Sequence, residues 1–445
     1  MLPQSYVPFN IQSGWIPNPD RESFRIFFES VLNTKPKNLA PSIKALKKLI
    51  EGDEVLTYLA NNAFQQNDNI IHAHQSTKEA PIPRIPDLET LLNAFNTILS
   101  LAPQFINNDL VGLPFSAIVV GIDATLGGST MFRIPKFNEK MKAILEEWGK
   151  FLVTPASAVG FSKENEQWLS PAAKKQYDFP LWKKDSQTLP YWKSWDSFFT
   201  RDFLDPKKSR PIASPNTNQV VICPNDGSLF CWQPKVQKRD VFWLKGMPYS
   251  LNDIFSSPDR RQNEIIKSYK LDEMFENGYV FQTYLNPYNF HRWWIPVNGK
   301  VLFDPIVIPG CFFSKLVLPD YGGATTASTP YLAEVNAKGL IVFETEDYGN
   351  VCCIPLGMSE VSSVVFDKQL KKGAHVTKGQ EMGMFHYGGS SFVVIYQNLP
   401  DKQLIFMDSD GNPYPQQPPP PGSSAGASNY GTNIGSQIGQ WYCKC

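Results

Sequence analysis

The sequence predicts an α+β protein, in which a helical N-terminal domain precedes a mainly β domain. Apolar residues recur at helical spacing in several segments of the first 185 residues. After about Leu181, short apolar runs alternate with turn residues, which is typical of antiparallel strands. A stretch rich in Pro, Gly and Ser follows, and such a composition cannot bury a core. We therefore expect a helical domain over 1–185, a β domain over 186–410 and a disordered tail over 411–445.

Four segments of the N-terminal part predict helices. The first surrounds Phe24–Leu32, the second begins near Ser42, and the fourth follows Pro135. In the third, Asp87 is a suitable N-cap because its carboxylate can accept a hydrogen bond from a backbone N–H of the first turn. The apolar stripes of the last three helices, which favour burial in a core, are Ile43, Leu46, Leu49 and Ile50; Leu88, Leu91, Leu92, Phe95 and Leu99; and Phe137, Met141, Ile144, Leu145, Trp148 and Leu152.

Composition argues against several kinds of partner. Lys plus Arg and Asp plus Glu both total 42, so the formal net charge is zero and favours neither nucleic acid nor an anionic membrane. The seven cysteines follow no disulfide or zinc spacing, so we expect a reducing, cytoplasmic location and no metal site. No apolar run approaches the roughly 20 residues that span a bilayer, and the N-terminus does not resemble a signal peptide. We therefore expect no stable membrane insertion.

The segment with the most distinctive chemistry lies near the C-terminus. Gly388 and Gly389 interrupt an aromatic run, Ser390 and Ser391 follow at once, and a β pattern resumes at Val393. A turn is the simplest interpretation of these dipeptides. Alternatively, the Ser390 hydroxyl could attack the carbonyl of Gly389, which has no Cβ to block the approach.

The second interpretation gains support from a resemblance. The Gly-Gly-Ser-Ser run, preceded by Lys378-Gly-Gln-Glu-Met-Gly-Met-Phe385, resembles the self-cleavage site of the phosphatidylserine decarboxylase family. Further segments resemble that family: Trp195–Phe203 with Arg210-Pro-Ile212, Pro224-Asn-Asp-Gly227, Phe242–Leu251, Tyr284–Gly299 and Gly357–Ser363. The match implies a decarboxylase-like catalytic domain over 186–410, and it is similar in particular to the soluble fungal tryptophan decarboxylase-like branch.

The resemblance implies a cofactor made from the chain itself. In the family, the serine attacks the preceding carbonyl, and cleavage between Gly389 and Ser390 would leave a pyruvoyl group on the new N-terminus. The two cleaved chains would stay associated. The ketone would form a Schiff base with a substrate amine and act as an electron sink during loss of CO₂. By the same resemblance, Asp226 belongs to the processing triad and His291 protonates the product carbon.

One position departs from the family pattern. His291, Arg292 and Pro296 match the family's His-Arg-x-His-x-Pro signature, but Trp294 replaces the second His, which is the base during self-cleavage. An indole N–H only donates and cannot take up a proton. We expect His386 to act as the base in place of the missing His, because on a regular strand it would share a face with Ser390 four residues later.

The Arg201 and Arg210 side chains are expected to make structural, charge-assisted hydrogen bonds.

These observations lead to one preferred function and two alternatives. The preferred function is a pyruvoyl-dependent decarboxylase that removes CO₂ from a soluble, aromatic L-amino acid such as tryptophan. The first alternative is a phosphatidylserine decarboxylase that makes phosphatidylethanolamine. The second is an unprocessed, non-catalytic homologue, in which Trp294 fills the position of the missing base.

Overall fold

A computed structural model of the chain describes residues 21–34, 38–74, 84–105, 113–123, 125–162, 166–239, 250–286, 288–314, 334–358, 360, 363–386, 390–415 and 431–444. The chain forms two compact units, which we describe separately. The first comprises Met1–Phe179, Lys184–Phe199 and Cys311–Thr329, and the second comprises Pro180–Lys183, Thr200–Gly310 and Pro330–Cys445. Residues 186–199 thus group with the helical unit, whereas we had assigned them to the β domain.

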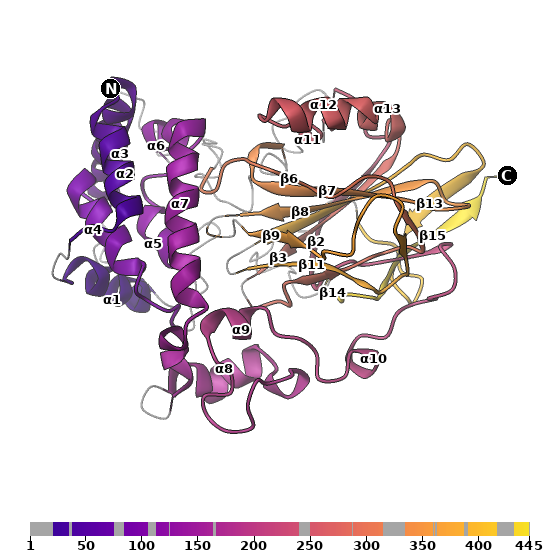
Figure 1. Cartoon of the computed structure of the whole chain (residues 1–445), viewed down its shortest axis with the longest axis horizontal. Coiled ribbons are helices and arrows are strands. Elements are labelled where there is room, and N and C mark those ends of the chain that lie inside the picture. The colour runs from indigo at the N-terminus through magenta and orange to yellow at the C-terminus, as the bar shows by residue number, and fades with distance from the viewer. Residues whose placement is uncertain are drawn as a thin grey trace. The chain divides into compact units, whose positions relative to one another are not determined.

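The first unit is helical (Figure 1). Its helices are α1 (Arg21–Leu32), α2 (Pro41–Glu51), α3 (Glu54–His74), α4 (Leu88–Ile98), α5 (Pro114–Val119), α6 (Leu126–Met131), α7 (Pro135–Leu152), α8 (Pro171–Gln176) and α9 (Trp195–Phe199), with 3₁₀ turns η1 (Pro155–Phe161) and η2 (Glu166–Leu169). The four predicted helices are confirmed as α1, α2, α4 and α7. Asp87 caps α4 as expected, since its carboxylate accepts a 2.8 Å hydrogen bond from the Thr90 N–H.

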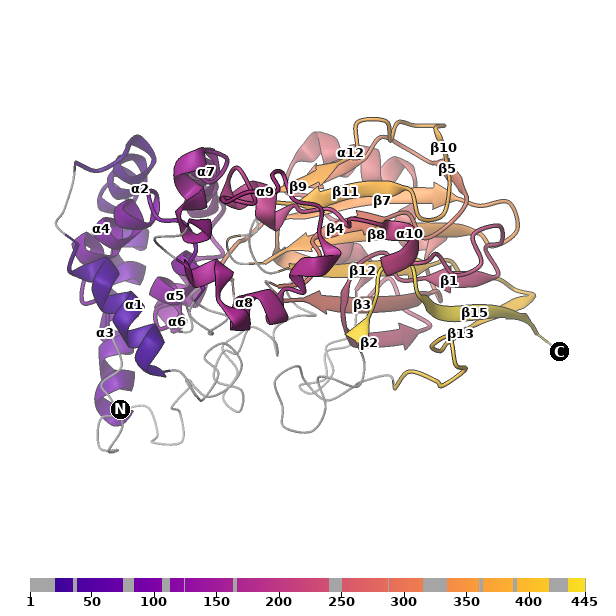
Figure 2. The same cartoon turned by 90° about the horizontal axis from the view of Figure 1, so that it is seen from below.

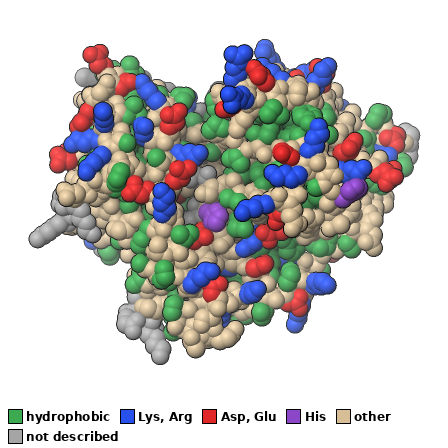
Figure 3. All heavy atoms as spheres, in the orientation of Figure 1, with side chains coloured by type: hydrophobic (Ala, Val, Ile, Leu, Met, Phe, Trp, Pro, Cys, Tyr) green, Lys and Arg blue, Asp and Glu red, His purple; other side chains and the backbone are tan. Residues whose placement is uncertain are grey.

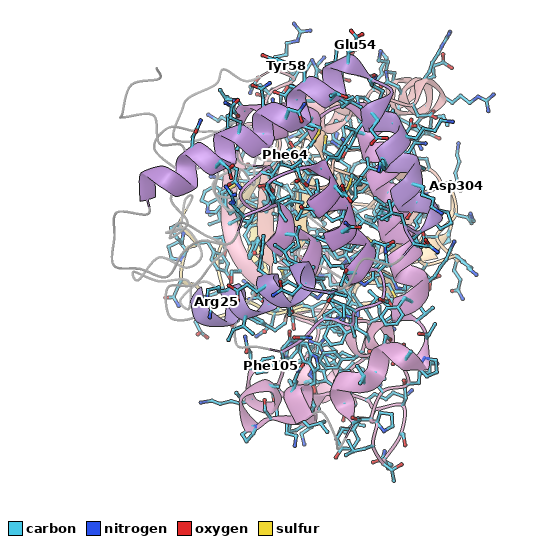
Figure 4. The ribbon with its side chains drawn as sticks, turned by 90° about the vertical axis from the view of Figure 1, so that its left-hand side faces the viewer. Arg25, Glu54, Tyr58, Phe64, Phe105 and Asp304 are labelled. Carbon is cyan, nitrogen blue, oxygen red and sulfur yellow. The ribbon has the colours of Figure 1, made fainter. Side chains whose placement is uncertain are left out.

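Close contacts between helices build the core of this unit. The Phe115 ring lies 5.3 Å from the rings of both Phe95 and Trp148, which joins α5 to α4 and α7. Helix α3 presents one face inward, because Phe64 is buried and Tyr58 is exposed (Figure 4). Gly127 of α6 packs directly against the α3 backbone, where a Cβ atom would come within 2.7 Å of a carbonyl oxygen.

The second unit contains three sheets, which are mainly antiparallel. The largest has the order β10-β5-β7-β8-β12-β3-β2-β14, with β6 also on β7; the smaller ones are β4-β11-β9 and β1-β15-β13. The strands are β1 (Val220–Ile222), β2 (Gly227–Pro234), β3 (Tyr279–Leu285), β4 (Arg292–Trp294), β5 (Gly299–Val301), β6 (Ile306–Ile308), β7 (Lys338–Glu344), β8 (Asn350–Gly357), β9 (Val364–Phe366), β10 (His375–Val376), β11 (Glu381–Phe385), β12 (Ser390–Tyr396), β13 (Lys402–Phe406), β14 (Gly431–Thr432) and β15 (Gln437–Cys443). Together with the helical unit, these sheets confirm the predicted α+β class.

Each face of the large sheet is covered by a different layer. Short helices cover one face and share a buried apolar cluster with it: α11 (Leu251–Ile254), α12 (Arg260–Ser268) and α13 (Leu271–Met274). The small sheets pack on the other face, where Trp293 of β4 lies 6.0 Å from Phe392 and Phe406 of β13 lies 5.0 Å from Phe281, centroid to centroid. One further helix, α10 (Pro206–Ser209), and the 3₁₀ turn η3 (Phe179–Leu181) complete the described elements.

Strand β12 runs through the middle of the large sheet, between β8 and β3 (Figure 2). All seven of its residues are buried. A strand covered on both faces needs apolar residues at successive positions, and Phe392–Tyr396 meets that need. The two serines at its start and the hydroxyl of Tyr396 at its end are therefore the polar side-chain groups of this strand.

The predicted disordered tail is wrong for its last part. Residues 431–443 contain β14 and β15, and β15 pairs with both β1 and β13. Ile434, Ile438 and Trp441 are buried, so this segment supplies apolar side chains that the Pro-rich stretch before it lacks. Residues 416–430 lie outside the described part of the chain.

The length of the helices and the distribution of surface charge both bear on the expected partners. Within the described ranges, no helix is both long enough and apolar enough to cross a bilayer. On the face seen in Figure 3, Lys and Arg side chains are interspersed with Asp and Glu, in agreement with the equal numbers of the two kinds.

Candidate active site

Ser390 is the first residue of β12 and is fully buried, with 0% of its surface exposed. Its hydroxyl has no hydrogen-bond partner among the described residues. The neighbouring Ser391 is also buried, but its Oγ donates to the Thr283 carbonyl at 2.7 Å and accepts from the Gln282 amide at 2.8 Å. A buried hydroxyl without a partner costs roughly 1–3 kcal/mol and is available to react. Within the described ranges, Ser42, Ser314, Tyr396 and Thr432 also have such a hydroxyl.

One of the two strands beside Ser390 presents no side chain to it. In the β12–β8 pairing, Ser390 lies opposite Gly357, which has no side chain. The Gly357 N–H points to the other neighbour and donates to the Ala337 carbonyl at 2.9 Å. Ser390 and Gly357 therefore form a non-hydrogen-bonded pair, the kind in which opposing Cα atoms come closest, at about 4.5 Å.

His291 is buried next to the end of β11. Its carbonyl accepts a 2.9 Å hydrogen bond from the Phe385 N–H, and its ring nitrogen Nδ1 lies 2.8 Å from the Asn289 carbonyl oxygen. A carbonyl only accepts, so Nδ1 carries the proton and Nε2 carries the lone pair.

Burial and a neighbouring positive charge both lower the pKa of this ring. Burial lowers the pKa of His291 to about 3, the positive charge of Arg201 contributes, and the hydrogen bond to Asn289 opposes the shift. Arg201 itself donates to the carbonyls of Tyr288 and Asn289, at 2.9 and 3.2 Å. His291 is therefore a neutral imidazole in the uncleaved chain at pH 7.

His386 does not share a strand with Ser390, so the predicted common strand face is wrong. Strand β11 ends at Phe385 and pairs with β4 and β9, whereas β12 begins at Ser390 and pairs with β3 and β8. The intervening residues 387–389 include Gly389, the predicted cleavage position, and lie outside the described part of the chain. His386 is half-buried, and its backbone N–H donates to the Ser363 carbonyl at 3.2 Å.

The Asp226 carboxylate accepts three hydrogen bonds. Arg210 donates two hydrogen bonds to its carboxylate, at 3.0 and 2.8 Å, and the Ile434 N–H donates a third at 2.7 Å. The two side chains are only 8% and 17% exposed. Arg210 thus makes the charge-assisted structural contact that the sequence predicted.

Trp294 is buried beside this ion pair. Its backbone N–H donates to the Pro224 carbonyl at 2.8 Å, two residues before Asp226, and its ring meets Phe203 edge-on at 6.3 Å. The described structure therefore places an apolar ring, and no proton acceptor, at the position where the family signature has its second His. Arg292, the signature's Arg, pairs with Glu381 at 2.7 Å and has a structural role.

Two residues that the sequence analysis missed lie near Gly357. Asn336 is 1% exposed, and its Nδ2 donates to the Gly357 carbonyl at 2.9 Å. Glu360 is 3% exposed and follows Gly357 by three residues, in the segment that leads to Ser363. No local motif marks Asn336, whereas Glu360 lies within Gly357–Ser363, a segment that resembles the family.

Comparisons with known proteins identify relatives of this chain. Two family models described as phosphatidylserine decarboxylase match residues 40–177 and 195–410. The chain is 34% identical to decarboxylase iboD of Amanita muscaria (strain Koide BX008), over 64% of this chain and 84% of that protein. It is 27% identical to an L-tryptophan decarboxylase of Psilocybe cubensis, over 75% and 78% of the two chains. It is 26% identical to a phosphatidylserine decarboxylase proenzyme of Clostridium novyi (strain NT), over 61% and 79%.

The chain belongs to the phosphatidylserine decarboxylase family, and its fungal relatives place it in the fungal branch. It is accordingly a decarboxylase, a carboxy-lyase. Pyruvoyl dependence is typical of this family.

Proposed function

We propose that this protein makes a pyruvoyl group by cleaving itself between Gly389 and Ser390 and then decarboxylates a soluble, aromatic L-amino acid such as tryptophan. The observation that carries the proposal is the buried Ser390 hydroxyl, which has no partner among the described residues and lies opposite a glycine. A nucleophile that must attack its own backbone needs a free hydroxyl and space beside it. Ser391, whose hydroxyl is held by two hydrogen bonds, has neither.

Self-cleavage proceeds in balanced steps. Ser390 Oγ attacks the Gly389 carbonyl carbon, an ester forms and the peptide C–N bond breaks. Removal of the Ser390 Cα proton then breaks the Cβ–O bond, which leaves a carboxylate on Gly389 and a dehydroalanine at 390. The imine tautomer of that residue takes up water and releases ammonia, which gives the pyruvoyl group. When present, this group supplies a ketone that binds an amine and accepts electrons as CO₂ leaves.

We assign His291 and His386 to different proton transfers. Asp226 is held by Arg210, and Trp294 has no lone pair to offer, so His386 is proposed as the base that removes the Cα proton of Ser390. His291 is proposed to protonate the substrate carbon. Its Nε2 must first gain a proton, and its depressed pKa makes the protonated ring a strong acid.

Substitutions separate these two roles. His386→Ala is expected to slow or abolish chain cleavage, whereas His291→Gln is expected to cleave and then to fail in product formation. If His386→Ala cleaves at the wild-type rate, His386 is not the base. If His291→Gln forms product normally, His291 is not the proton donor.

The substrate class rests on the relatives. The fungal L-tryptophan decarboxylase aligns over 75% of this chain, and the bacterial phosphatidylserine decarboxylase over 61%. Phosphatidylserine is the second candidate, because the matching family models are named for it.

A substrate panel tests the choice. Purified protein is first checked for cleavage on a denaturing gel, and then incubated with tryptophan, tyrosine, phenylalanine and phosphatidylserine vesicles. We expect an aromatic amine and CO₂ as products. Phosphatidylethanolamine as the sole product would refute the amino-acid assignment, and one intact 50.2 kDa chain would favour the non-catalytic alternative.

A further inference from the structure

Arg201 and His291 share one backbone acceptor, the carbonyl oxygen of Asn289. His291 Nδ1 lies 2.8 Å from this oxygen, and Arg201 Nη2 donates to it at 3.2 Å. The same Nη2 also donates to the Tyr288 carbonyl at 2.9 Å. A carbonyl oxygen has two lone pairs, so the Asn289 oxygen can accept from both side chains at once. The guanidinium is therefore fixed beside the imidazole, on its Nδ1 side.

Aromatic packing holds the guanidinium in this position. Arg201 is 2% exposed, and its Cζ lies 4.3 Å from the centroid of the Trp182 ring, where the ring attracts the cation. Trp182 in turn stacks on Phe290, the residue before His291, with 5.7 Å between centroids. A backbone bridge between Trp182 and Phe203 anchors the ring. One packed cluster therefore contains both Arg201 and the segment that carries His291.

A second arginine ties the same two segments but differs in its effect on the ring. Arg292 Nε donates to the Thr200 carbonyl at 2.9 Å, so it joins the residue after His291 to the residue before Arg201. The Arg292 charge is paired with the Glu381 carboxylate at 2.7 Å. Of these two arginine charges, that of Arg201 contributes to the lowered pKa of His291.

These contacts assign different tasks to the two ring nitrogens of His291. Because Nδ1 donates to an oxygen that Arg201 also holds, the ring keeps the tautomer in which Nε2 carries the lone pair. A proton that the ring gains must then bind Nε2. The guanidinium disfavours a second positive charge beside it, so the protonated ring releases this proton more readily.

We infer that Arg201 is a positioning residue for His291: it fixes the carbonyl that holds Nδ1, and its charge favours proton release from Nε2. The inference rests on the proposed function for the use of that proton, which is transfer to the substrate carbon. The contacts themselves are present in the uncleaved chain, so they can be tested without product formation.

Substitutions separate the charge of Arg201 from its hydrogen bonds. Arg201→Gln keeps N–H donors for the carbonyls and removes the charge, whereas Arg201→Lys keeps the charge. Arg292→Gln is the matched control, because it loses a hydrogen bond between the same two segments. A purely structural role of Arg201 predicts that Arg201→Gln and Arg292→Gln have the same effect on the protonation of His291.

The measurement is nuclear magnetic resonance of protein labelled with ¹⁵N in its histidine rings. The chain has five histidines, and His291→Gln identifies the signals of His291 by their loss. In wild type near neutral pH, we expect Nδ1 to carry the proton. At about pH 5, the protonated fraction of His291 should be about tenfold higher in Arg201→Gln than in wild type, because loss of a nearby charge raises the pKa by about one unit. Arg201→Lys and Arg292→Gln should match wild type.

The pH profile of product formation is a second readout. Because the proposed transfer needs a protonated His291, the profile of Arg201→Gln should move to higher pH by about one unit, and that of Arg201→Lys should not move. Chain cleavage of both variants on a denaturing gel should equal that of wild type, since the inference gives Arg201 no part in that step.

Several results would overturn the inference. They are a proton on Nε2 in place of Nδ1 in wild type, an unchanged protonated fraction or pH profile in Arg201→Gln, and an equal rise of that fraction in Arg201→Lys or Arg292→Gln. The wild-type result needs no variant, so it decides the matter even if the Arg201 variants do not fold. If wild type forms no product, the proposed function fails, while the resonance measurements still test the contacts of Arg201.

Discussion

The polar groups around Ser390 and those around Asp226 are similarly buried, but they differ in their hydrogen bonding. Asp226 accepts three hydrogen bonds, two of them from Arg210. Ser390 and Asn336 each keep one buried oxygen that has no partner within the described residues. Both regions belong to motifs of one decarboxylase family, so motif matching alone would give them equal weight.

The difference in hydrogen bonding separates stability from chemistry. A guanidinium that pairs with a buried carboxylate stabilises the fold, because the carboxylate would otherwise be buried without a charge partner. A buried hydroxyl without a partner costs stability and is available to react. We therefore assign Asp226 mainly to the support of the fold and Ser390 to the reaction, and four experiments examine that division.

The largest effect is expected at the paired serines. Ser390→Ala should abolish chain cleavage, because it removes the attacking oxygen. Ser391→Ala should cleave, because its hydroxyl is already bonded to Thr283 and Gln282. Denaturing gels of both purified variants provide the measurement. If Ser390→Ala is still cleaved, another residue is the nucleophile, and the contrast between the Ser390 and Asp226 regions fails.

Next in size is loss of the ion pair. Arg210→Met should lower the free energy of unfolding by about 3 kcal/mol, because it leaves the buried Asp226 carboxylate without its charge partner. Arg260→Met is the matched control: its pair with Glu264 is exposed, so a change below about 0.5 kcal/mol is expected. Urea unfolding measures both. Equal losses in the two variants would remove the structural role of Arg210.

A smaller effect concerns the pH dependence of stability. The pKa of His291 is about 3 in the folded chain and about 6.5 when unfolded, so between these values the unfolded state binds the extra proton. Stability contributed by neutral His291 is thus complete above pH 6.5 and is lost as the pH falls towards 3, by up to about 1.4 kcal/mol per pH unit.

His291→Gln should flatten that slope, and the exposed His375→Gln should leave it unchanged. Urea unfolding at several pH values between about 4 and 6.5, which lie between the two pKa values, gives the slopes. An unchanged slope in His291→Gln would show that His291 is not held neutral by burial.

The smallest effect is expected from restoring the family residue. Trp294→His should change the cleavage rate by less than about tenfold, because Asp226 already binds Arg210 and cannot readily orient a new imidazole. Cleavage is followed from fresh translation product on a gel. If wild type stays intact and Trp294→His cleaves, Trp294 has disabled processing and the non-catalytic alternative is correct.

Much of the fold could be predicted from local patterns. Periodic apolar residues and the Asp87 cap located four helices of the first unit, since these signals are contained within one turn or two. The C-terminal strand β15 was missed, because the Pro-rich composition before it was extended to the end of the chain. Its apolar residues are few, and the strand is defined by its pairing with β1 and β13.

The candidate site was only partly predictable, for the same physical reason. Ser390, His291 and Asp226 follow from motifs, but their hydrogen bonding does not. The placement of His386 was wrong because the chain leaves one sheet after Phe385 and enters another at Ser390. The hydrogen bond from Asn336 to Gly357, which pairs with Ser390, depends on strand registers that one sequence does not reveal.

The most direct test is the intact mass of the purified protein under denaturing conditions. We predict two chains, residues 1–389 and 390–445, with the second lighter by one ammonia than its sequence requires and reactive with hydrazine. A single chain of 50.2 kDa that does not react with hydrazine would contradict the account.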